Sequence, residues 1–395
     1  MNGFDKYYEM YRSECEGVSF CPYRLSPLGA HIDHQKGIVS GWAIDRGVTL
    51  YYGIKHNGVV ELSSLSYDKR AQFFVSAVPE ERVGDWADYL RGVTKILGEK
   101  YKLQYGLKGV IEGSLPVGGL SSSAAVTISF LTALASVNSI ELSDWDIITI
   151  ARRAENEYVG VNCGLLDQGT EVLSRRGHLF TLDTLDSTYS NLEMPQNMKP
   201  FSLVIFFSGL ERNLKSNNSY NLRQDECKAA SYALKGFAGL EYGSFSDSFL
   251  RDVPETVYDE YKDRLPSVWH RRAEHYYSEM KRVRKGMESW RAGDIDAFGE
   301  LVFESGESSI RNYECGCDEL ISLYNILREI EGVIGARFSG AGFKGFVMSI
   351  VEKGMEEEVM MKVESEYLSL YPALKGKYAS YVTQISDGVG EMRRR

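Results

Sequence analysis

The chain has 395 residues, 43% of them hydrophobic, which is enough to build two or three globular domains. Its formal net charge of -10 disfavours nucleic acids and anionic membranes as partners, and no stretch is long and apolar enough to span a membrane. Without a recognisable leader or paired Cys-x-x-Cys motifs among the six cysteines, the sequence predicts a cytoplasmic protein that acts on a small molecule and has neither a zinc site nor a disulfide framework.

The first distinctive stretch is RLSPLGAHIDHQKG, residues 24–37, in which His31 and His34 bracket Asp33. On local chemistry it is a metal site, a structural turn or a surface for a small polar ligand. A transition-metal site would need ligands elsewhere as well, and the chain has six histidines without a second obvious cluster.

Hydrophobic patterning predicts a mixture of α and β elements along the chain. Strands are expected over residues 38–55 and 106–112, and helices over 122–137 and 146–159. A polar link near residue 195 precedes an apolar run that ends near 207, so we place a domain boundary at 195. Further on, the sequence predicts a long charged helix within 266–295 and a strand, glycine loop and strand over 335–351.

Between residues 113 and 134 a glycine loop enters a helix. Gly118 and Gly119 precede Ser121, Ser122 and Ser123, which are candidate helix caps. The unpaired N–H groups of a first helical turn bind anions, and glycines let a phosphate approach them closely. No Gly-Lys-Ser/Thr follows, so this is not a Walker loop. The loop therefore binds phosphate or is simply a well-capped helix start.

A second glycine loop, GAGFKG at 340–345, matches the dinucleotide fingerprint as a string. That fingerprint must open a helix, whereas the following FVMSIV is an apolar run typical of a strand. We interpret the loop as a turn between two strands.

Two carboxylates that follow the first glycine loop, Glu155 and Asp167, are candidate site residues. Glu155 falls in the apolar stripe of a helix that begins with a capping box of Ser143 and Asp146, and its charge would need either Mg²⁺ or Arg152 as a partner. Asp167, in GVNCGLLDQG, follows that helix and either faces a pocket or belongs to an ordinary turn.

Taken in order, these segments resemble the motifs of the GHMP small-molecule kinases, and within that superfamily the galactokinases. Residues 24–37 resemble the galactokinase signature, LPVGGLSSSAA (115–125) the phosphate-binding motif, and GVNCGLLDQ (160–168) the segment of the catalytic aspartate. SYNLRQDEC (219–227) resembles the segment of a sugar-contacting tyrosine, and RFSGAGFKG (337–345) the third, glycine-rich motif. The resemblance implies a two-domain α+β fold, residues 1–195 and 196–395, with the active site between the domains.

The resemblance also implies roles for individual residues. Asp167 would accept or orient the proton of the anomeric hydroxyl of a sugar, and Arg24 would stabilise charge beside it. Ser122 and Glu155 would hold Mg²⁺. The remaining implied contacts are those to the sugar, from Ala30, His31, Asp33, His34, Gly164 and Tyr220, and those to ATP, from Trp86, Pro116, Gly118, Gly119, Leu120, Ser121, Ser122, Ser123, Gly340 and Gly342. Trp86 is equally compatible with a place in the core.

Two positions depart from the galactokinase pattern. Ala30 replaces a glutamate that contacts the C6 hydroxyl in that family, and His34 replaces a tyrosine. A glutamate would repel a C6 carboxylate about 4 Å away by roughly 4 kcal/mol at an effective dielectric near 20. The stretch also resembles its counterpart in galacturonokinases, so we expect a 1-kinase of galacturonate.

Several alternatives stay open from the sequence. One is a galactokinase or arabinokinase with an atypical C6 pocket. The other is a sugar sensor that binds sugar and ATP without turnover. The presence of Arg24, Ser122, Glu155 and Asp167 argues against a sensor, because a non-catalytic relative would be free to lose one of them. Candidate cations for a C6 carboxylate are Lys36, Arg46, Arg212 and Lys215. We expect a monomer or weak homodimer.

Overall fold

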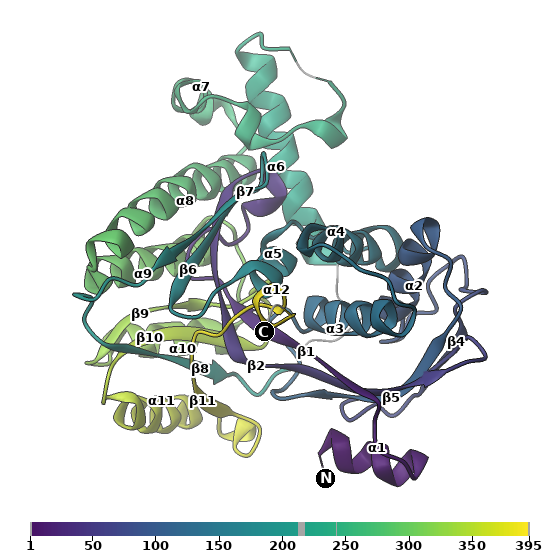
Figure 1. Ribbon diagram of the computed structural model, residues 1–395. Helices are drawn as coiled ribbons and strands as arrows, with labels where there is room; N and C mark the ends of the chain where they lie inside the picture. The colour runs from purple at the N-terminus through teal and green to yellow at the C-terminus, as the bar shows by residue number, and fades with distance from the viewer. Residues whose placement is uncertain (1, 212–217, 242, 394–395) are drawn as a thin grey trace.

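The computed structural model describes residues 2–211, 218–241 and 243–393, and within them the strands form two separate sheets (Figure 1). The side chains of residues 218–220 and 391 lie outside this description. Both sheets carry helices, which confirms the expected α+β class.

The first sheet belongs to the first half of the chain and has the strand order β4-β3-β5-β2-β6-β7, with β1 paired to β2. The long strand β2 is at its centre, because it pairs antiparallel with β1, β5 and β6. The strands predicted over 38–55 and 106–112 are confirmed. The strands are β1 (Gly17–Leu25), β2 (Ile38–Lys55), β3 (Val59–Ser64), β4 (Ala71–Phe74), β5 (Gly106–Gly113), β6 (His178–Asp183) and β7 (Thr188–Glu193).

Helices cover this sheet on both faces, with α1 on the side opposite α3 (Figure 1). Helix α3 is apolar almost all round and is buried between the sheet and its neighbours α2 and α4, as expected for such a composition. The helices of this half are α1 (Gly3–Tyr11), α2 (Asp88–Lys100), α3 (Ser122–Val137), α4 (Asp144–Arg153) and α5 (Leu166–Leu173).

The helix predicted over 146–159 differs from the structure in one respect. Helix α4 begins with the expected capping box of Ser143 and Asp146, but the backbone from Ala154 to Val159 is a π-helix. A π turn inserts an extra residue and changes the directions of the side chains after it, a feature frequent at functional sites. Gly160, at φ 80°, ends the segment. Glu155 lies within it.

The second sheet is antiparallel, with the order β11-β8-β10-β9. Helices α9 and α10 pack on β9, α8 packs on α9, and α6 on α8 (Figure 1). The predicted long helix and the strand–loop–strand unit are confirmed. The elements are β8 (Phe201–Phe207), α6 (Asn218–Phe237), α7 (Glu255–Tyr261), α8 (Ser267–Ala292), α9 (Ile295–Arg311), α10 (Asp318–Glu329), β9 (Val333–Phe338), β10 (Phe346–Glu352), α11 (Glu356–Leu370) and β11 (Ala379–Thr383).

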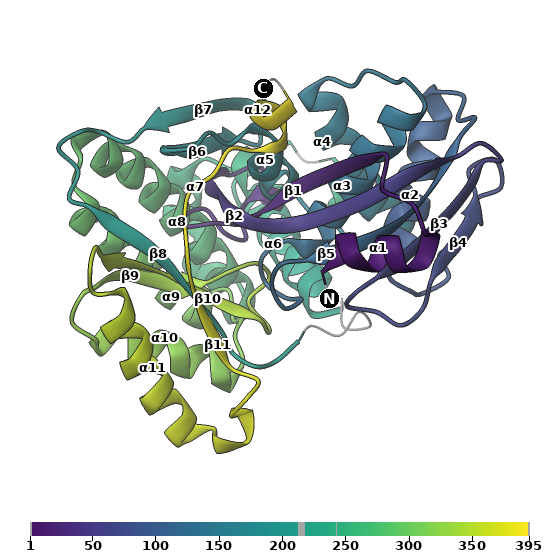
Figure 2. The same ribbon diagram turned by 60° about the horizontal axis from the view of Figure 1, so that its bottom comes forward.

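The end of the chain returns to the first half. Ile385 forms a bridge with Ile44, and α12 (Val389–Arg393) packs against α5 (Figure 2). The domain boundary expected at 195 falls in the link between the two sheets and stays a prediction. Among the described residues no helix has the length and apolarity to cross a membrane. All six cysteines are free thiols.

Candidate active site

A cavity of about 330 Å³ brings most of the expected site residues together. The first half supplies most of its wall, and the loop at 340–344 between β9 and β10 closes one side. The predicted site residues that line it are Arg24, Ala30, His31, Asp33, Trp86, Gly118, Gly119, Ser121, Ser122, Ser123, Glu155, Gly164, Asp167 and Gly340.

Arg24 and Asp167 form an ion pair in this wall. Nε and a terminal nitrogen of Arg24, near the end of β1, both lie 2.8 Å from Oδ1 of Asp167, in the first turn of α5. The Arg24 side chain is 4% exposed and that of Asp167 27%, so the carboxylate is the partner open to the cavity. Arg24 also donates to the carbonyl oxygen of Gly119 at 3.2 Å and to the hydroxyl of Ser339 at 3.4 Å. One buried guanidinium therefore connects the carboxylate to both glycine loops.

The sugar-signature loop forms one end of the cavity. Asp33 begins a short 3-10 helix, Asp33–Gln35, and its Oδ2 accepts the amide of Leu166 at 3.3 Å. Gly164 passes so close that an added Cβ would lie 2.1 Å from the same oxygen, which explains the glycine. Burial raises the pKa of Asp33 to about 6, and the charge of Asp167 adds to the rise against the opposing Leu166 amide.

His31 is held in the wall of this end by an aromatic stack. It adopts a left-handed backbone, φ 65°, and its ring lies 4.3 Å from that of Tyr313 at 14°. Its Nε2 lies 3.6 Å from Sγ of Cys315. Burial and the nearby His275 lower the pKa of His31 well below its usual value, so the ring is neutral.

The structure does not place His34 among the residues that line the cavity, so its expected sugar contact stays a prediction. Its Nε2 lies 3.1 Å from the hydroxyl of Tyr313, and its Nδ1 3.1 Å from Nε2 of Gln35. His34 is therefore a neighbour of the stack.

The two glycine loops lie backbone against backbone. A Cβ on Gly345 would come within 2.6 Å of the carbonyl carbon of Gly118, and one on Gly340 within 2.7 Å of the oxygen of Gly119. Only glycine allows this approach, and both Gly340 and Gly345 have positive φ. The loop at 340–345 thus closes over the loop at 118–123.

The start of α3 fits a phosphate group. Ser121 occupies the N-cap position in a left-handed conformation, φ 58°, but its buried hydroxyl makes no capping bond and has no hydrogen-bond partner among the described residues. A buried hydroxyl without a partner is costly unless a ligand completes it. Beside it, the first turn of a 16-residue helix presents free N–H groups, and Lys344 of the facing loop also lines the cavity.

Three residues expected to contact ATP do not line the cavity. Pro116 is half-buried in the approach to the loop. The carbonyl oxygen of Leu120 accepts the amide of Arg24 at 3.3 Å and so fastens the loop to β1. Gly342 packs on Cys315, whose Sγ would be 2.9 Å from an added Cβ.

Ser122 and Glu155 line the same cavity and are the oxygen-bearing side chains that could hold a magnesium ion there. Glu155 is 3% exposed, and its Oε1 accepts Nε2 of Gln168 at 2.9 Å. Arg152, its alternative partner by sequence, is exposed and donates to the carbonyl oxygen of Cys163 instead. Mg²⁺ is commonly bound by one or two oxygen side chains together with substrate phosphates, which is the donor set offered here.

An aromatic end of the cavity suits a nucleotide base. Trp86 is 5% exposed and lies parallel to Tyr67, with ring centroids 6.2 Å apart. Its Nε1 donates to the carbonyl oxygen of Lys69 at 2.7 Å. Tyr67 and Tyr89 complete this end and had not been expected, since an isolated tyrosine gives no signal in the sequence.

The candidate cations for a C6 carboxylate find other places. Lys36 pairs with Asp252 at 3.3 Å and Arg46 with Asp45 at 3.5 Å, and neither lines the cavity. Arg212, Lys215 and the side chain of Tyr220 lie outside the described residues.

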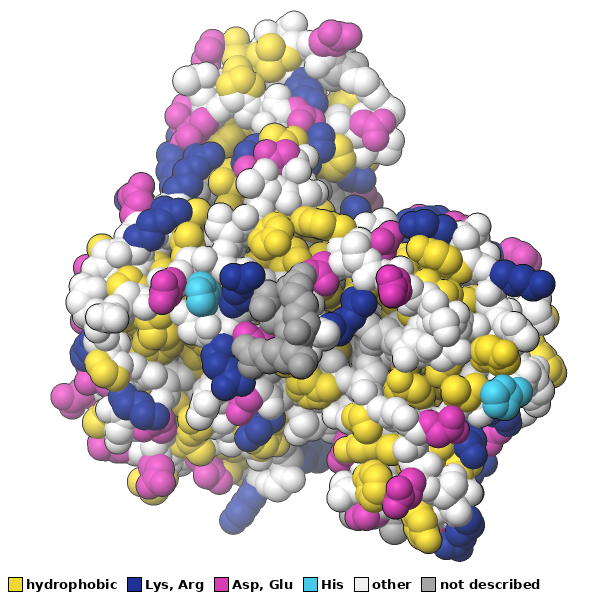
Figure 3. Space-filling model, in the orientation of Figure 1, with side chains coloured by type: hydrophobic (Ala, Val, Ile, Leu, Met, Phe, Trp, Pro, Cys, Tyr) yellow, Lys and Arg dark blue, Asp and Glu magenta, His cyan; other side chains and the backbone are white. Residues whose placement is uncertain are grey.

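On the face in Figure 3 acidic and basic side chains are interspersed, which suits a small ligand better than a polyanion.

Comparisons with known proteins agree with this geometry. Residues 88–175 match the family model of the GHMP kinase N-terminal domain. A galacturonokinase from Arabidopsis thaliana is 38% identical over 90% of this chain and 88% of its own length, and a galactokinase from Thermosipho africanus 32% identical over 94% and 99%. The crystal structure of Lactococcus lactis galactokinase complexed with galactose has a TM-score of 0.87 at 25% identity and covers 98% of this chain and 97% of its own.

Proposed function

Since this chain belongs to the galactokinase branch of the GHMP kinase superfamily and is a sugar 1-kinase, we propose that its sugar substrate is galacturonate. The reaction would transfer the γ-phosphoryl group of ATP to the anomeric hydroxyl and release galacturonate 1-phosphate and ADP. Both substrates would lie in the one cavity, the sugar near Asp33 and Asp167 and the base near Trp86.

The observation that carries the choice of galacturonate is Ala30. It lines the cavity beside His31 and Asp33 and is 5% exposed. A methyl side chain leaves room for the second oxygen of a carboxylate and contributes no charge, whereas a glutamate would repel that carboxylate by roughly 4 kcal/mol. The higher identity to a galacturonokinase than to the Thermosipho africanus galactokinase supports the same choice.

Asp167 and Arg24 account for the chemistry at the acceptor oxygen. The Asp167 carboxylate would take the proton of the anomeric hydroxyl as the oxygen attacks phosphorus, and Arg24, 2.8 Å away, would stabilise the negative charge that develops. Phosphoryl transfer needs little more from a protein than positioning and charge stabilisation.

The phosphate chain of ATP would lie on the start of α3. The first-turn N–H groups and the Ser121 hydroxyl would donate to it, and the loop at 340–345 would exclude water above it. Magnesium, held by Ser122 and Glu155, would supply positive charge to the phosphates.

Galactose is the second candidate, because the Thermosipho africanus relative and the Lactococcus lactis structure are galactokinases. A coupled ADP-release assay with galacturonate, glucuronate, galactose and arabinose distinguishes the two. We expect the highest kcat/KM with galacturonate. A higher kcat/KM with galactose or arabinose would show that galacturonate is not the preferred substrate.

A further inference from the structure

Helix α8 buries a row of polar side chains where a core helix normally presents an apolar stripe. Arg272, His275, Glu279 and Arg282 are spaced three, four and three residues apart and so share one face. None is more than 9% exposed. Buried polar groups need partners, so the partners of this row indicate its role.

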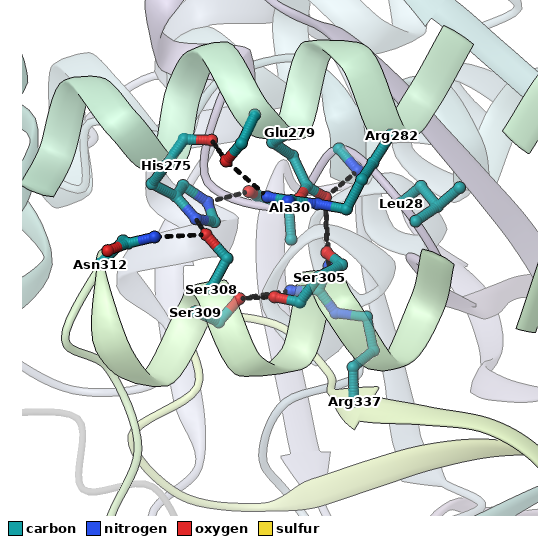
Figure 4. A network of polar contacts seen from close by, with 12 residues as sticks. Leu28, Ala30, His275, Glu279, Arg282, Ser305, Ser308, Ser309, Asn312 and Arg337 are labelled. Atoms are coloured by element: carbon teal, nitrogen blue, oxygen red, sulfur yellow. Dashed lines mark hydrogen bonds and ion pairs between the residues drawn. The ribbon is translucent and has the colours of Figure 1, made fainter. Parts of the chain in front are cut away.

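Two members of the row hold the sugar-signature loop on either side of Ala30 (Figure 4). Oε1 of Glu279 accepts the amide of Gly29 at 2.7 Å, and Nε2 of His275 lies 3.0 Å from the carbonyl oxygen of Ala30. One turn of α8 therefore fastens both ends of the Gly29–Ala30 segment. Neither His275 nor Glu279 lines the cavity.

The contacts of His275 define its tautomer. A carbonyl oxygen can only accept, so Nε2 carries the proton and donates to Ala30. Nδ1 then accepts from the hydroxyl of Ser308, 3.0 Å away on α9. Nδ2 of Asn312 donates in turn to the same hydroxyl at 3.2 Å. Burial lowers the pKa of His275 to about 4, which keeps the ring neutral at physiological pH.

Glu279 is a charged group with its own partners. Burial alone would raise its pKa, but the guanidinium groups of Arg282 and Arg337 outweigh burial and bring it to about 2. Nε of Arg282 donates to Oε2 at 2.7 Å, and the Ser305 hydroxyl to Oε1 at 2.6 Å. Both oxygens of the anion that holds Gly29 thus have hydrogen-bond partners.

Arg272, the first residue of the row, holds the backbone around Tyr313, whose ring stacks on His31. Arg272 donates to the carbonyl oxygen of Asn312 and to the carboxylate of Glu314, each at 2.5 Å. Tyr313 lies between these two residues in sequence and stacks on His31. One face of α8 therefore holds both the Gly29–Ala30 backbone and the residues on either side of Tyr313.

We propose that His275 and Glu279 are positioning residues that set where Ala30 and His31 lie at the sugar end of the cavity. They act through the backbone of the loop and touch neither substrate. The inference rests on the sugar-kinase assignment and does not depend on which sugar is the substrate.

His275 is the better residue to test. Replacing Glu279 would leave two buried guanidinium groups without their anion, which is expected to unfold the protein. His275→Leu removes the donor to Ala30 together with the acceptor of the Ser308 hydroxyl, and leaves no buried charge unpaired. His275→Gln restores a side-chain N–H at a similar reach, and His270→Leu, on the same helix near Tyr258, is the matched control.

The experiment measures KM for both substrates with whichever sugar the wild type phosphorylates best, so an error in the choice of galacturonate leaves the test intact. His275→Leu should raise the sugar KM roughly five- to tenfold and leave the ATP KM within about twofold. His275→Gln should recover most of the loss, and His270→Leu should change neither value.

A lower melting temperature with both KM values unchanged in His275→Leu would mean a structural role only and would overturn the proposal. So would an equal rise in both KM values. Should that variant not fold, His275→Asn decides, because its amide can take the place of Nδ1 beside the Ser308 hydroxyl but is too short to donate to the carbonyl oxygen of Ala30. Its sugar KM should rise about two- to threefold, and an unchanged sugar KM would overturn the proposal.

Discussion

At the scale of single residues, the Arg24–Asp167 pair carries the proposed chemistry. Asp167→Asn keeps the shape of the side chain and an oxygen for Arg24, but removes the proton acceptor. We expect kcat to fall on the order of a hundred- to ten-thousandfold while the affinity for ATP stays within about twofold. Single-turnover phosphorylation close to the wild-type rate would remove Asp167 from the mechanism.

Asp33 links sugar binding to stability through its raised pKa. The pKa of Asp33 is about 6 in the folded state and 3.8 ordinarily. Between these pH values the folded state therefore binds more protons than the unfolded state. The contribution of Asp33 to the free energy of unfolding falls as pH rises through this window. Asp33→Asn should therefore raise the free energy of unfolding at pH 8 by about 1–3 kcal/mol and change it little at pH 4.

The same substitution should weaken sugar binding, since an ionised Asp33 accepts from sugar hydroxyls. Urea unfolding at the two pH values and the sugar KM at pH 8 provide the measurements. An equal change in stability at pH 4 and pH 8 would contradict the assignment of the raised pKa to Asp33.

Ser122 and Glu155 are expected to determine the magnesium requirement. Ser122→Ala and Glu155→Gln should each raise the Mg²⁺ concentration for half-maximal activity by roughly tenfold, because each removes one oxygen ligand or its charge. Glu157→Gln is the control, since Glu157 is exposed and pairs with Arg153. Magnesium titrations that leave both cavity variants at the wild-type value would reject this metal site.

At the scale of elements, the contact between the glycine loops can be separated from backbone strain. Gly345 and Gly354 have similar φ values, +101° and +97°, but a Cβ on Gly345 meets Gly118 whereas one on Gly354 meets nothing within 4 Å. Both alanine variants should lose about 1 kcal/mol of stability from the positive φ. Gly345→Ala should also raise the ATP KM at least roughly fivefold, because the loops must separate.

Titrating ATP against both variants measures this difference. Equal ATP KM values for Gly345→Ala and Gly354→Ala would show that the loop contact does not shape the nucleotide site.

Elements with strong local patterns were predictable from the sequence, as strand β2 and helices α3 and α8 show. The π-helical segment at Glu155 was not, because the inserted residue leaves no trace in hydrophobic spacing. The polar row of α8 was not either. His275 and Ala30 are 245 residues apart in the chain, and local periodicity carries no information on such a contact.

At the scale of the whole molecule, the order of five motifs led to the correct superfamily and fold, and most of the site residues that it implied line one cavity. Motif order works because each motif places backbone and small side chains around one ligand. It did not reveal the contact of His34 with Tyr313, or the aromatic partner Tyr67, since these depend on tertiary packing outside the motifs.

The choice of galacturonate is tested most directly by the ratio of kcat/KM for galacturonate over that for galactose, in the wild type, in Ala30→Glu and in Ala30→Gln. Glutamine adds nearly the same volume as glutamate without the charge. The wild-type ratio should exceed one, and Ala30→Glu should lower it on the order of a thousandfold, the equivalent of about 4 kcal/mol. Ala30→Gln should lower it far less. A wild-type ratio below one, or equal effects of glutamate and glutamine, would contradict the account.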